Sequence, residues 1–98
     1  MANSFTSILI HIIFSTHIRE QLLQSDFRNR LFAYMGGIAR ESKIKAISIG
    51  GVMDQAHMLT LIPASIAIAK AVQLIKGASS KWLHENIIPL NNFAWQEG

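Results

Sequence analysis

A β-hairpin predicted between residues 45 and 62 is the feature that most constrains the fold of this chain. The run from Lys45 to Ile49 leads into two glycines, and a second run of strand-forming residues extends from Gln55 to about Ile62. Two such runs, separated by a few turn-forming residues, favour antiparallel pairing with the turn near Met53 and Asp54. Asp54 is interpreted as a turn former, with a role near a metal as the alternative.

Gln55 and His57 form a candidate pair of metal ligands. They lie two positions apart in the return strand, so both side chains leave the same face. Ligands about 6–7 Å apart along a strand can hold one divalent ion when a third ligand comes from elsewhere. A polar strand end that lies against water is the alternative, and it is the preferred interpretation from the pattern alone.

A first strand is predicted from Thr6 to Thr16, because this run is rich in isoleucine and bounded by polar residues. Its apolar character indicates a central strand that is buried on both faces. His11 lies in its middle. We interpret it as a core or interface histidine with a satisfied hydrogen bond, in preference to a metal ligand.

Two helices are predicted from apolar stripes. The first is capped by Ser25 or Asp26 and runs to about Ser42, and the second is capped by Ser65. Tyr34 lies on the apolar stripe of the first helix, so we interpret it as a core or interface residue and not as a nucleophile. The apolar stripe of the first helix comprises Phe27, Leu31, Tyr34 and Ile38, and the packed side of the second comprises Ile68, Val72, Ile75, Ser79 and Trp82.

A last short strand is predicted from Phe93 to Gln96, after Pro89 breaks the second helix. The order strand, helix, strand, strand, helix, strand predicts an α+β protein with the ferredoxin-like βαββαβ fold. Such a fold has an antiparallel four-stranded sheet with two helices on one face.

The second predicted helix also carries a polar stripe that faces away from its packed side. Several donors along one line suit a phosphate backbone, and an ordinary solvated face is the alternative. Arg19 lies in the loop after the first strand, where either a DNA contact or a solvated turn fits. The stripe comprises Lys70, Gln73, Lys76, Ser80, Lys81 and His84.

Composition bounds the class of protein. The 98 residues make one domain, 1–98, and half of them are hydrophobic, which favours burial against a second copy in a homodimer. The sequence has no apolar run of about 18 residues or more and no cysteine or signal peptide, so we expect no membrane association and a cytoplasmic location. A net charge of +3 fits an anionic partner such as nucleic acid but does not require one.

Four segments carry a resemblance to a known family. They are His11–Thr16, Asp54–Leu59, the Leu-Ile-Lys-Gly-Ala-Ser-Ser-Lys segment at 74–81, and Phe93–Gly98. Together they make the chain resemble, from end to end, the single-tyrosine HUH transposases of the insertion sequence 200/605 family. That family carries Asp-His-apolar-His-Leu-Leu in the strand that corresponds to residues 54–59.

The resemblance implies the ferredoxin-like fold and a divalent metal, Mg or Mn, held by the histidines of the HUH motif. It also implies attack of a tyrosine hydroxyl on single-stranded DNA, which gives a 5′-phosphotyrosine link. With the resemblance, DNA contact becomes the preferred interpretation of the polar stripe. The residues expected to contact DNA are Arg19, Lys70, Gln73, Lys76, Ser80 and Lys81.

The departures from the family limit the expected activity. Gln55 stands where the family has its first metal-binding histidine, and only His57 of the pair remains. The family continues into a helix that bears the nucleophile, whereas this sequence ends at Gly98 and Tyr34 matches no nucleophile position. We therefore expect a domain without the tyrosine helix, weak or no metal binding at Gln55 and His57, and binding of single-stranded or hairpin DNA by a catalytically defective homodimer.

Two other functions stay open. The first is a noncatalytic dimerising module that modulates a full-length transposase, which the high apolar content supports. The second is an RNA-binding ferredoxin-like module. It fits less well, because such modules stack bases on exposed aromatics of the central strands and only Phe14 is available there.

Overall fold

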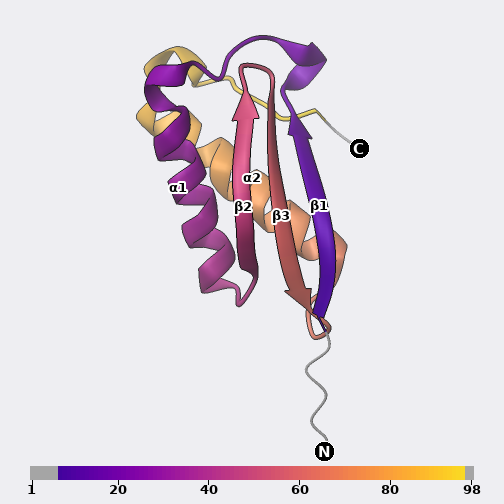
Figure 1. Ribbon diagram of the computed structural model, residues 1–98. Coiled ribbons are helices and arrows are strands. Elements are labelled where there is room, and N and C mark those ends of the chain that lie inside the picture. The colour runs from indigo at the N-terminus through magenta and orange to yellow at the C-terminus, as the bar shows by residue number, and fades with distance from the viewer. Residues whose placement is uncertain (1–6, 97–98) are drawn as a thin grey trace, which may run out of the picture.

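The computed structural model describes residues 7–96, and its sheet is built around β3, Gln55–Pro63. β3 pairs antiparallel with β1, Ser7–Ser15, on one side and with β2, Lys45–Val52, on the other, giving the strand order β1-β3-β2 (Figure 1). Side chains along β3 alternate strictly between buried and half-buried, as expected for a strand with one covered face.

The predicted hairpin is confirmed. Val52 pairs with Gln55, so the chain turns at Met53 and Asp54 as the sequence indicates. Gly51 lies at the narrow end of this hairpin, where a Cβ atom would collide with the backbone of Gln55 and Ala56. Only glycine therefore allows the two strands to approach so closely beside the turn.

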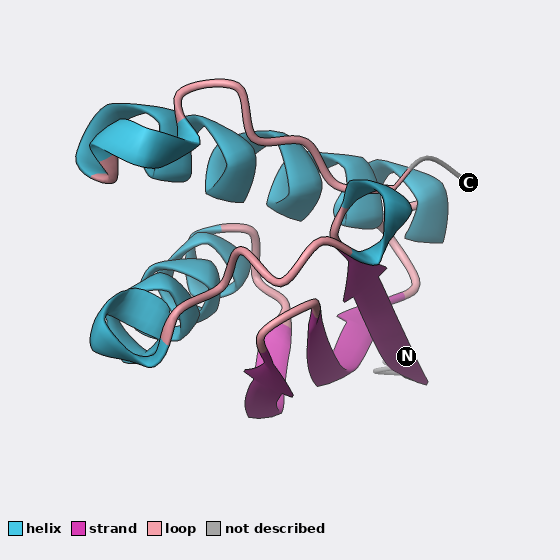
Figure 2. Ribbon diagram, turned by 90° about the horizontal axis from the view of Figure 1, so that it is seen from above, coloured by secondary structure: helices cyan, strands magenta, loops and turns pink. Residues whose placement is uncertain are grey.

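Two helices cover one face of the sheet and leave the other open (Figure 2). α1 spans Ser25–Glu41 and buries Phe27, Leu31, Met35 and Ala39, at a spacing of four residues. α2 spans Ile68–Asn86 and likewise buries Ala71, Ile75, Ser79 and Leu83. The element types and their order match the sequence-based expectation up to this point.

The predicted helix caps are wrong. Ser25 is already the first residue of α1, Gln24 is its N-cap, and no side chain caps this end. α2 begins later than expected, at Ile68 with Ala67 as N-cap, so Ser65 is too far away to cap it. Packing of the apolar stripes, and not local capping, therefore determines where these helices start.

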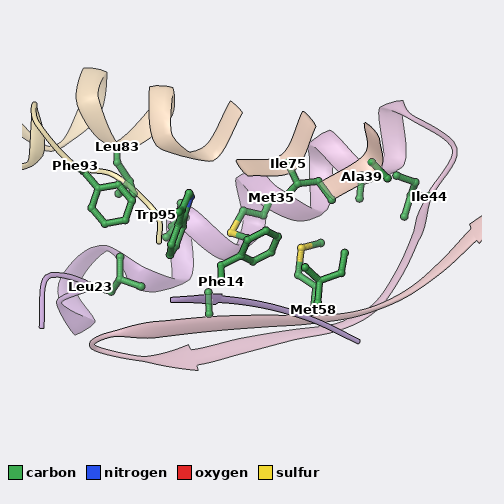
Figure 3. Close-up of a cluster of buried hydrophobic side chains, with 14 of the residues drawn as sticks. Phe14, Leu23, Met35, Ala39, Ile44, Met58, Ile75, Leu83, Phe93 and Trp95 are labelled. Carbon is green, nitrogen blue, oxygen red and sulfur yellow. The ribbon is translucent and has the colours of Figure 1, made fainter. Parts of the chain in front are cut away.

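The core lies between the sheet and the two helices. Phe14 from β1, Met58 from β3, Met35 from α1 and Ile75 from α2 meet there (Figure 3). Trp95, from the segment after α2, enters the same core and is 5% exposed. One contiguous core over the described residues is consistent with a single domain.

The predicted fourth strand, Phe93 to Gln96, is not formed as a strand. The chain after α2 makes a short 3₁₀ turn at Ile88–Leu90 and then a single β-bridge from Trp95 to Thr16. Among the described residues the sheet therefore has three strands, and β1 lies at its edge instead of its centre. Phe93 and Trp95 turn inward to fill the core, and the segment pairs antiparallel with the chain only at the end of β1.

Ser79 couples α2 to this C-terminal segment. Its Oγ accepts a hydrogen bond of 3.0 Å from the indole Nε1 of Trp95 and donates one of 2.6 Å to the carbonyl of Ile75. Because both Ser79 and Trp95 are buried, loss of the hydroxyl would leave the indole N–H without a partner and out of reach of water.

We expect Ser79→Ala to lower the free energy of unfolding by about 1–3 kcal/mol, the cost of a buried unpaired donor. Urea unfolding of the full chain, followed by circular dichroism, measures the change. The matched control is Ser80→Ala, whose hydroxyl makes only contacts of 3.4 and 3.5 Å, and it should cost about 0.5 kcal/mol or less. Equal costs for the two variants would contradict the role given to Ser79.

Candidate functional site

The open face of the sheet carries the predicted ligand pair. Gln55 and His57 belong to the half-buried positions of β3, which alternate with the buried positions that point toward the helices. The prediction that both side chains leave one face is therefore confirmed. On β1, the exposed positions Leu9, His11 and Ile13 lie on the same open face.

His57 lies directly opposite Gly50 on β2. A Cβ atom at Gly50 would lie 3.2 Å from Cε1 and 3.3 Å from Nε2 of His57, so the edge of the imidazole rests over the glycine. On its other side, the ring of His57 lies 5.6 Å from the ring of His11, centroid to centroid, at an interplanar angle of 88°. His57 is thus placed between a glycine and a second imidazole.

The expectation that His11 is a core histidine is wrong, because its side chain is exposed on the open face. The same finding corrects the prediction that β1 is buried on both faces. The strand order explains the difference: β1 is an edge strand of the described sheet, and the helices cover only its inward positions.

The ligand set at this face is small. Within residues 7–96, no group of three or more His, Cys, Asp or Glu side chains is placed so that it could hold a metal ion. Gln55 and His57 supply one amide and one imidazole, and an amide oxygen is a much weaker donor to a transition metal than an imidazole nitrogen. These residues fit a divalent ion only as a weak, incomplete site.

Asp54 is engaged by Arg19. The Nη2 and Nε atoms of Arg19 lie 2.9 and 3.0 Å from Oδ2 of Asp54, and the side chain of Arg19 stays 58% exposed. The backbone carbonyl of Asp54 accepts a bond of 3.0 Å from the amide of Thr16. Asp54 thus acts as a turn residue that also positions Arg19 at the end of the sheet.

The polar stripe of α2 divides into two groups. Lys76 Nζ donates to the carbonyl of Gln96 at 3.0 Å, and Ser80 Oγ donates to the carbonyl of Phe93 at 3.4 Å. Nε2 of His84 lies 2.6 Å from the same carbonyl of Phe93. These three side chains hold the C-terminal segment against α2. The remaining members of the stripe are exposed: Lys70, Gln73 and Lys81.

The structure does not bring the stripe and the ligand pair together. α2 lies on the helical side of the sheet, whereas Gln55 and His57 lie on the open side (Figure 2). Among the predicted DNA-contacting residues, Arg19 contacts the turn before Gln55, through its ion pair with Asp54 at the end of the sheet.

The surroundings of two aromatic residues, Tyr34 and Phe14, were not fully predicted from the sequence. Tyr34 is half-buried in the helical layer and stacks on Trp82 of α2, with ring centroids 5.9 Å apart, while Arg30 lies 5.7 Å from the Trp82 centroid. The four-residue spacing of Arg30 and Tyr34 on α1 was the available signal for this cluster. Phe14 is only 2% exposed, so it cannot serve as the stacking platform of an RNA-binding module.

A groove between α1 and the edge strand β2 was also not anticipated. Its volume is about 740 Å³, and its lining combines apolar side chains such as Phe32 and Ile49 with three cations. These cations are Arg40, Lys43 and Lys45. The groove is therefore a second basic surface, separate from the stripe on α2.

These features define an α+β protein with an antiparallel sheet, two helices on one face and an imidazole–amide pair on the other. Residues 4–98 match the family described as "Transposase IS200 like", and the chain belongs to that family. The comparison agrees with the resemblance carried by the Asp54–Leu59 and Leu74–Lys81 segments.

A solved structure supports the same fold. The chain is similar to the crystal structure of a Deinococcus radiodurans R1 protein assigned as a transposase, with a TM-score of 0.82 and 21% sequence identity. The match covers 89% of this chain and 67% of that one, and at this identity it establishes the fold alone. No curated protein matches the sequence. Neither helix in residues 7–96 has the length and apolar content needed to cross a membrane.

Proposed function

We propose that this chain binds single-stranded or hairpin DNA and does not itself transfer strands. Membership of the IS200-like transposase family is the observation that carries the proposal. The exposed donors Lys70, Gln73 and Lys81 on α2 support it, because a row of cations and amides suits a phosphate backbone. Arg19 adds a partly exposed guanidinium at the end of the sheet.

The proposed loss of catalysis rests on two placements. Gln55 offers a weak oxygen donor where the family resemblance places an imidazole, which lowers the affinity for a divalent metal. Tyr34, the one tyrosine of the printed sequence, stacks on Trp82 across the sheet from His57. A phenol in the helical layer is not within reach of a phosphate held at the open face.

A metal ion would have a limited role in such a protein. Gln55 and His57 would hold Mg²⁺ or Mn²⁺ weakly, and a bound ion would polarise a phosphodiester. Because the one tyrosine, Tyr34, belongs to α1 and not to that face, His57 and Gln55 would serve to bind phosphate through the ion and not to support attack by a phenol.

A second candidate function is a noncatalytic dimerising module that modulates a full-length transposase. The open face favours this function, because Leu9 is 59% exposed, Ile13 57% and Val52 56%. Clustered exposed apolar side chains favour association with a second chain. A homodimer through this face is also compatible with DNA binding by α2, which lies on the other side.

We expect Lys81→Glu to weaken binding to a hairpin oligonucleotide by about 3- to 10-fold and to reduce the slope of log K against log salt by about 1. Fluorescence anisotropy titrations at several salt concentrations measure both quantities. Lys45→Glu, which makes the same change in net charge in the groove beside β2, is the matched comparison. A larger loss in Lys45→Glu would move the DNA contact to that groove, and affinity no better than for an acidic polymer would remove the DNA-binding proposal.

We expect no covalent adduct when the chain is incubated with labelled single-stranded DNA and Mg²⁺ or Mn²⁺, because Tyr34 lies away from His57. Denaturing gels that resolve protein–DNA adducts provide the measurement. Tyr34→Phe is the matched control and should give the same result. An adduct that disappears in Tyr34→Phe would overturn the proposed loss of catalysis.

If the chain is the dimerising module, it should dimerise at micromolar concentration and Ile13→Lys should be monomeric, because a buried lysine charge in the open face disfavours association. Sedimentation velocity across a dilution series measures the change. Ile88→Lys, which replaces an isoleucine that is 85% exposed outside the sheet, is the control and should leave the dimer intact. A monomer at all concentrations of the unmodified chain would exclude the dimerising module.

A further inference from the structure

Two histidines from different strands meet on the open face of the sheet. In the β1–β3 register, His11 pairs with Leu59 and His57 pairs with Ile13, so the two imidazoles are diagonal neighbours. Their ring centroids lie 5.6 Å apart. The residues that pair with them across the strands, Ile13 and Leu59, are apolar, and Gln55 is the polar side chain two positions from His57 on the same face.

The separation of the rings suits one shared metal ion. An imidazole nitrogen binds a zinc-class ion at about 2.0–2.1 Å, and two imidazoles on one tetrahedral ion have centroids roughly 5 Å apart. The observed 5.6 Å is close to that value. Rotation about the outer side-chain torsions of exposed His11 can close the difference, because the terminal torsion of an imidazole is broad.

Gly50 leaves space for the imidazole of His57 beside β2. Its lack of a Cβ atom lets the Cε1–Nε2 edge of His57 rest over β2, with hypothetical Cβ distances of 3.2 and 3.3 Å. A turn about χ2 can direct Nδ1 of His57 toward β1, because this torsion is broad for an imidazole. Nδ1 of His57 and one nitrogen of His11 can then converge on the same ion.

We propose that His11 and His57 form a cross-strand site for one divalent transition ion of the zinc class. Neutral imidazoles suit Zn²⁺, Co²⁺ and Ni²⁺, whereas Mg²⁺ prefers oxygen ligands. Two protein ligands leave the other coordination positions to water or to an anion such as a phosphate oxygen. The apolar side chains of Ile13 and Leu59 flank the site and limit competing hydration.

The site differs from the pair suggested by the family resemblance. That pair runs along β3 and uses Gln55, whereas this one crosses from β3 to β1 and does not need the amide. It also lies across the sheet from the DNA contacts proposed on α2. Metal binding by the two histidines and DNA binding by the donors on α2 can therefore fail independently of one another.

The test is isothermal titration of the full, untagged chain with ZnCl₂, comparing His11→Ala, His57→Ala and Gln55→Ala. Loss of partners outside the coordination sphere alone weakens metal affinity about 10–100-fold, so loss of either imidazole should weaken Zn²⁺ binding by at least about tenfold. Gln55→Ala should retain the affinity within about threefold, since the amide is a weak donor. His17→Ala removes another exposed histidine and is the control.

Two further measurements test the site without relying on the affinity for Zn²⁺. Co²⁺ bound by the chain should give visible absorption that disappears in His11→Ala and His57→Ala, and Zn²⁺ should raise Tm only in variants that retain both rings. Circular dichroism checks that each variant folds, and His11→Asn replaces His11→Ala if the alanine variant does not. Absence of Zn²⁺ binding in the unmodified chain, or loss of binding in Gln55→Ala with none in His11→Ala, would overturn the proposal.

Discussion

The alternation of buried and half-buried side chains along β3 is the constraint on which the arrangement of the molecule depends. Ala56, Met58, Thr60 and Ile62 are fully buried beneath the helices, and the positions between them lie on the open face. Because side chains alternate with a period of two, a shift of one residue would exchange the two faces of the strand and bury His57. The close approach of the two strands at Gly51, beside the turn at Met53 and Asp54, supports the register against β2, so a backbone constraint helps determine which polar side chains are available to a ligand.

The segment after α2 completes the core and also changes the surface of the helix. Trp95 enters the space between Phe14 and Phe93, at ring-centroid distances of 5.6 and 4.8 Å. Its backbone neighbours are held by donors on α2, among them Lys76, which bonds the carbonyl of Gln96. A polar side chain that closes an intramolecular contact must break it before it can bind a phosphate. The free energy available for an external ligand is therefore greater at Lys70 and Lys81, which are exposed, than at Lys76.

The hairpin and the two helices could be predicted from local patterns in the sequence, although the caps of the helices could not. The hairpin follows from two short strand-forming runs around a turn, and both helices follow from apolar stripes. The edge position of β1 could not be predicted, because it depends on pairing between distant segments, and the apolar run Ile8–Phe14 looks the same in either position. The exposure of His11 follows from that pairing and was missed for the same reason.

The local part of the candidate site could also be predicted from the sequence, whereas the contacts between distant segments could not. That Gln55 and His57 share a face follows from the two-residue period of a strand. That His11 lies close to His57 could be predicted only from the pairing of β1 with β3. The contacts of Lys76 and Ser80 with the C-terminal segment could be predicted only if the path of that segment were known, and the sequence suggested a strand there. Each miss is thus a contact between residues that are far apart in the sequence.

The residues on the open face can support binding of a phosphate but not its cleavage by Tyr34. Cleavage of a phosphodiester needs a Lewis acid on the phosphate oxygens and also a nucleophile in line with the leaving oxygen, whereas binding needs only the Lewis acid or a set of donors. Imidazoles on β1 and β3 can supply the first, through an ion. The phenol of Tyr34 lies in the other layer, stacked on Trp82, and a rotamer change cannot carry it through the sheet. A metal ion held by His11 and His57, instead of by Gln55 and His57, would therefore bind a phosphate more strongly. It would still not place the phenol of Tyr34 in line for attack on that phosphate.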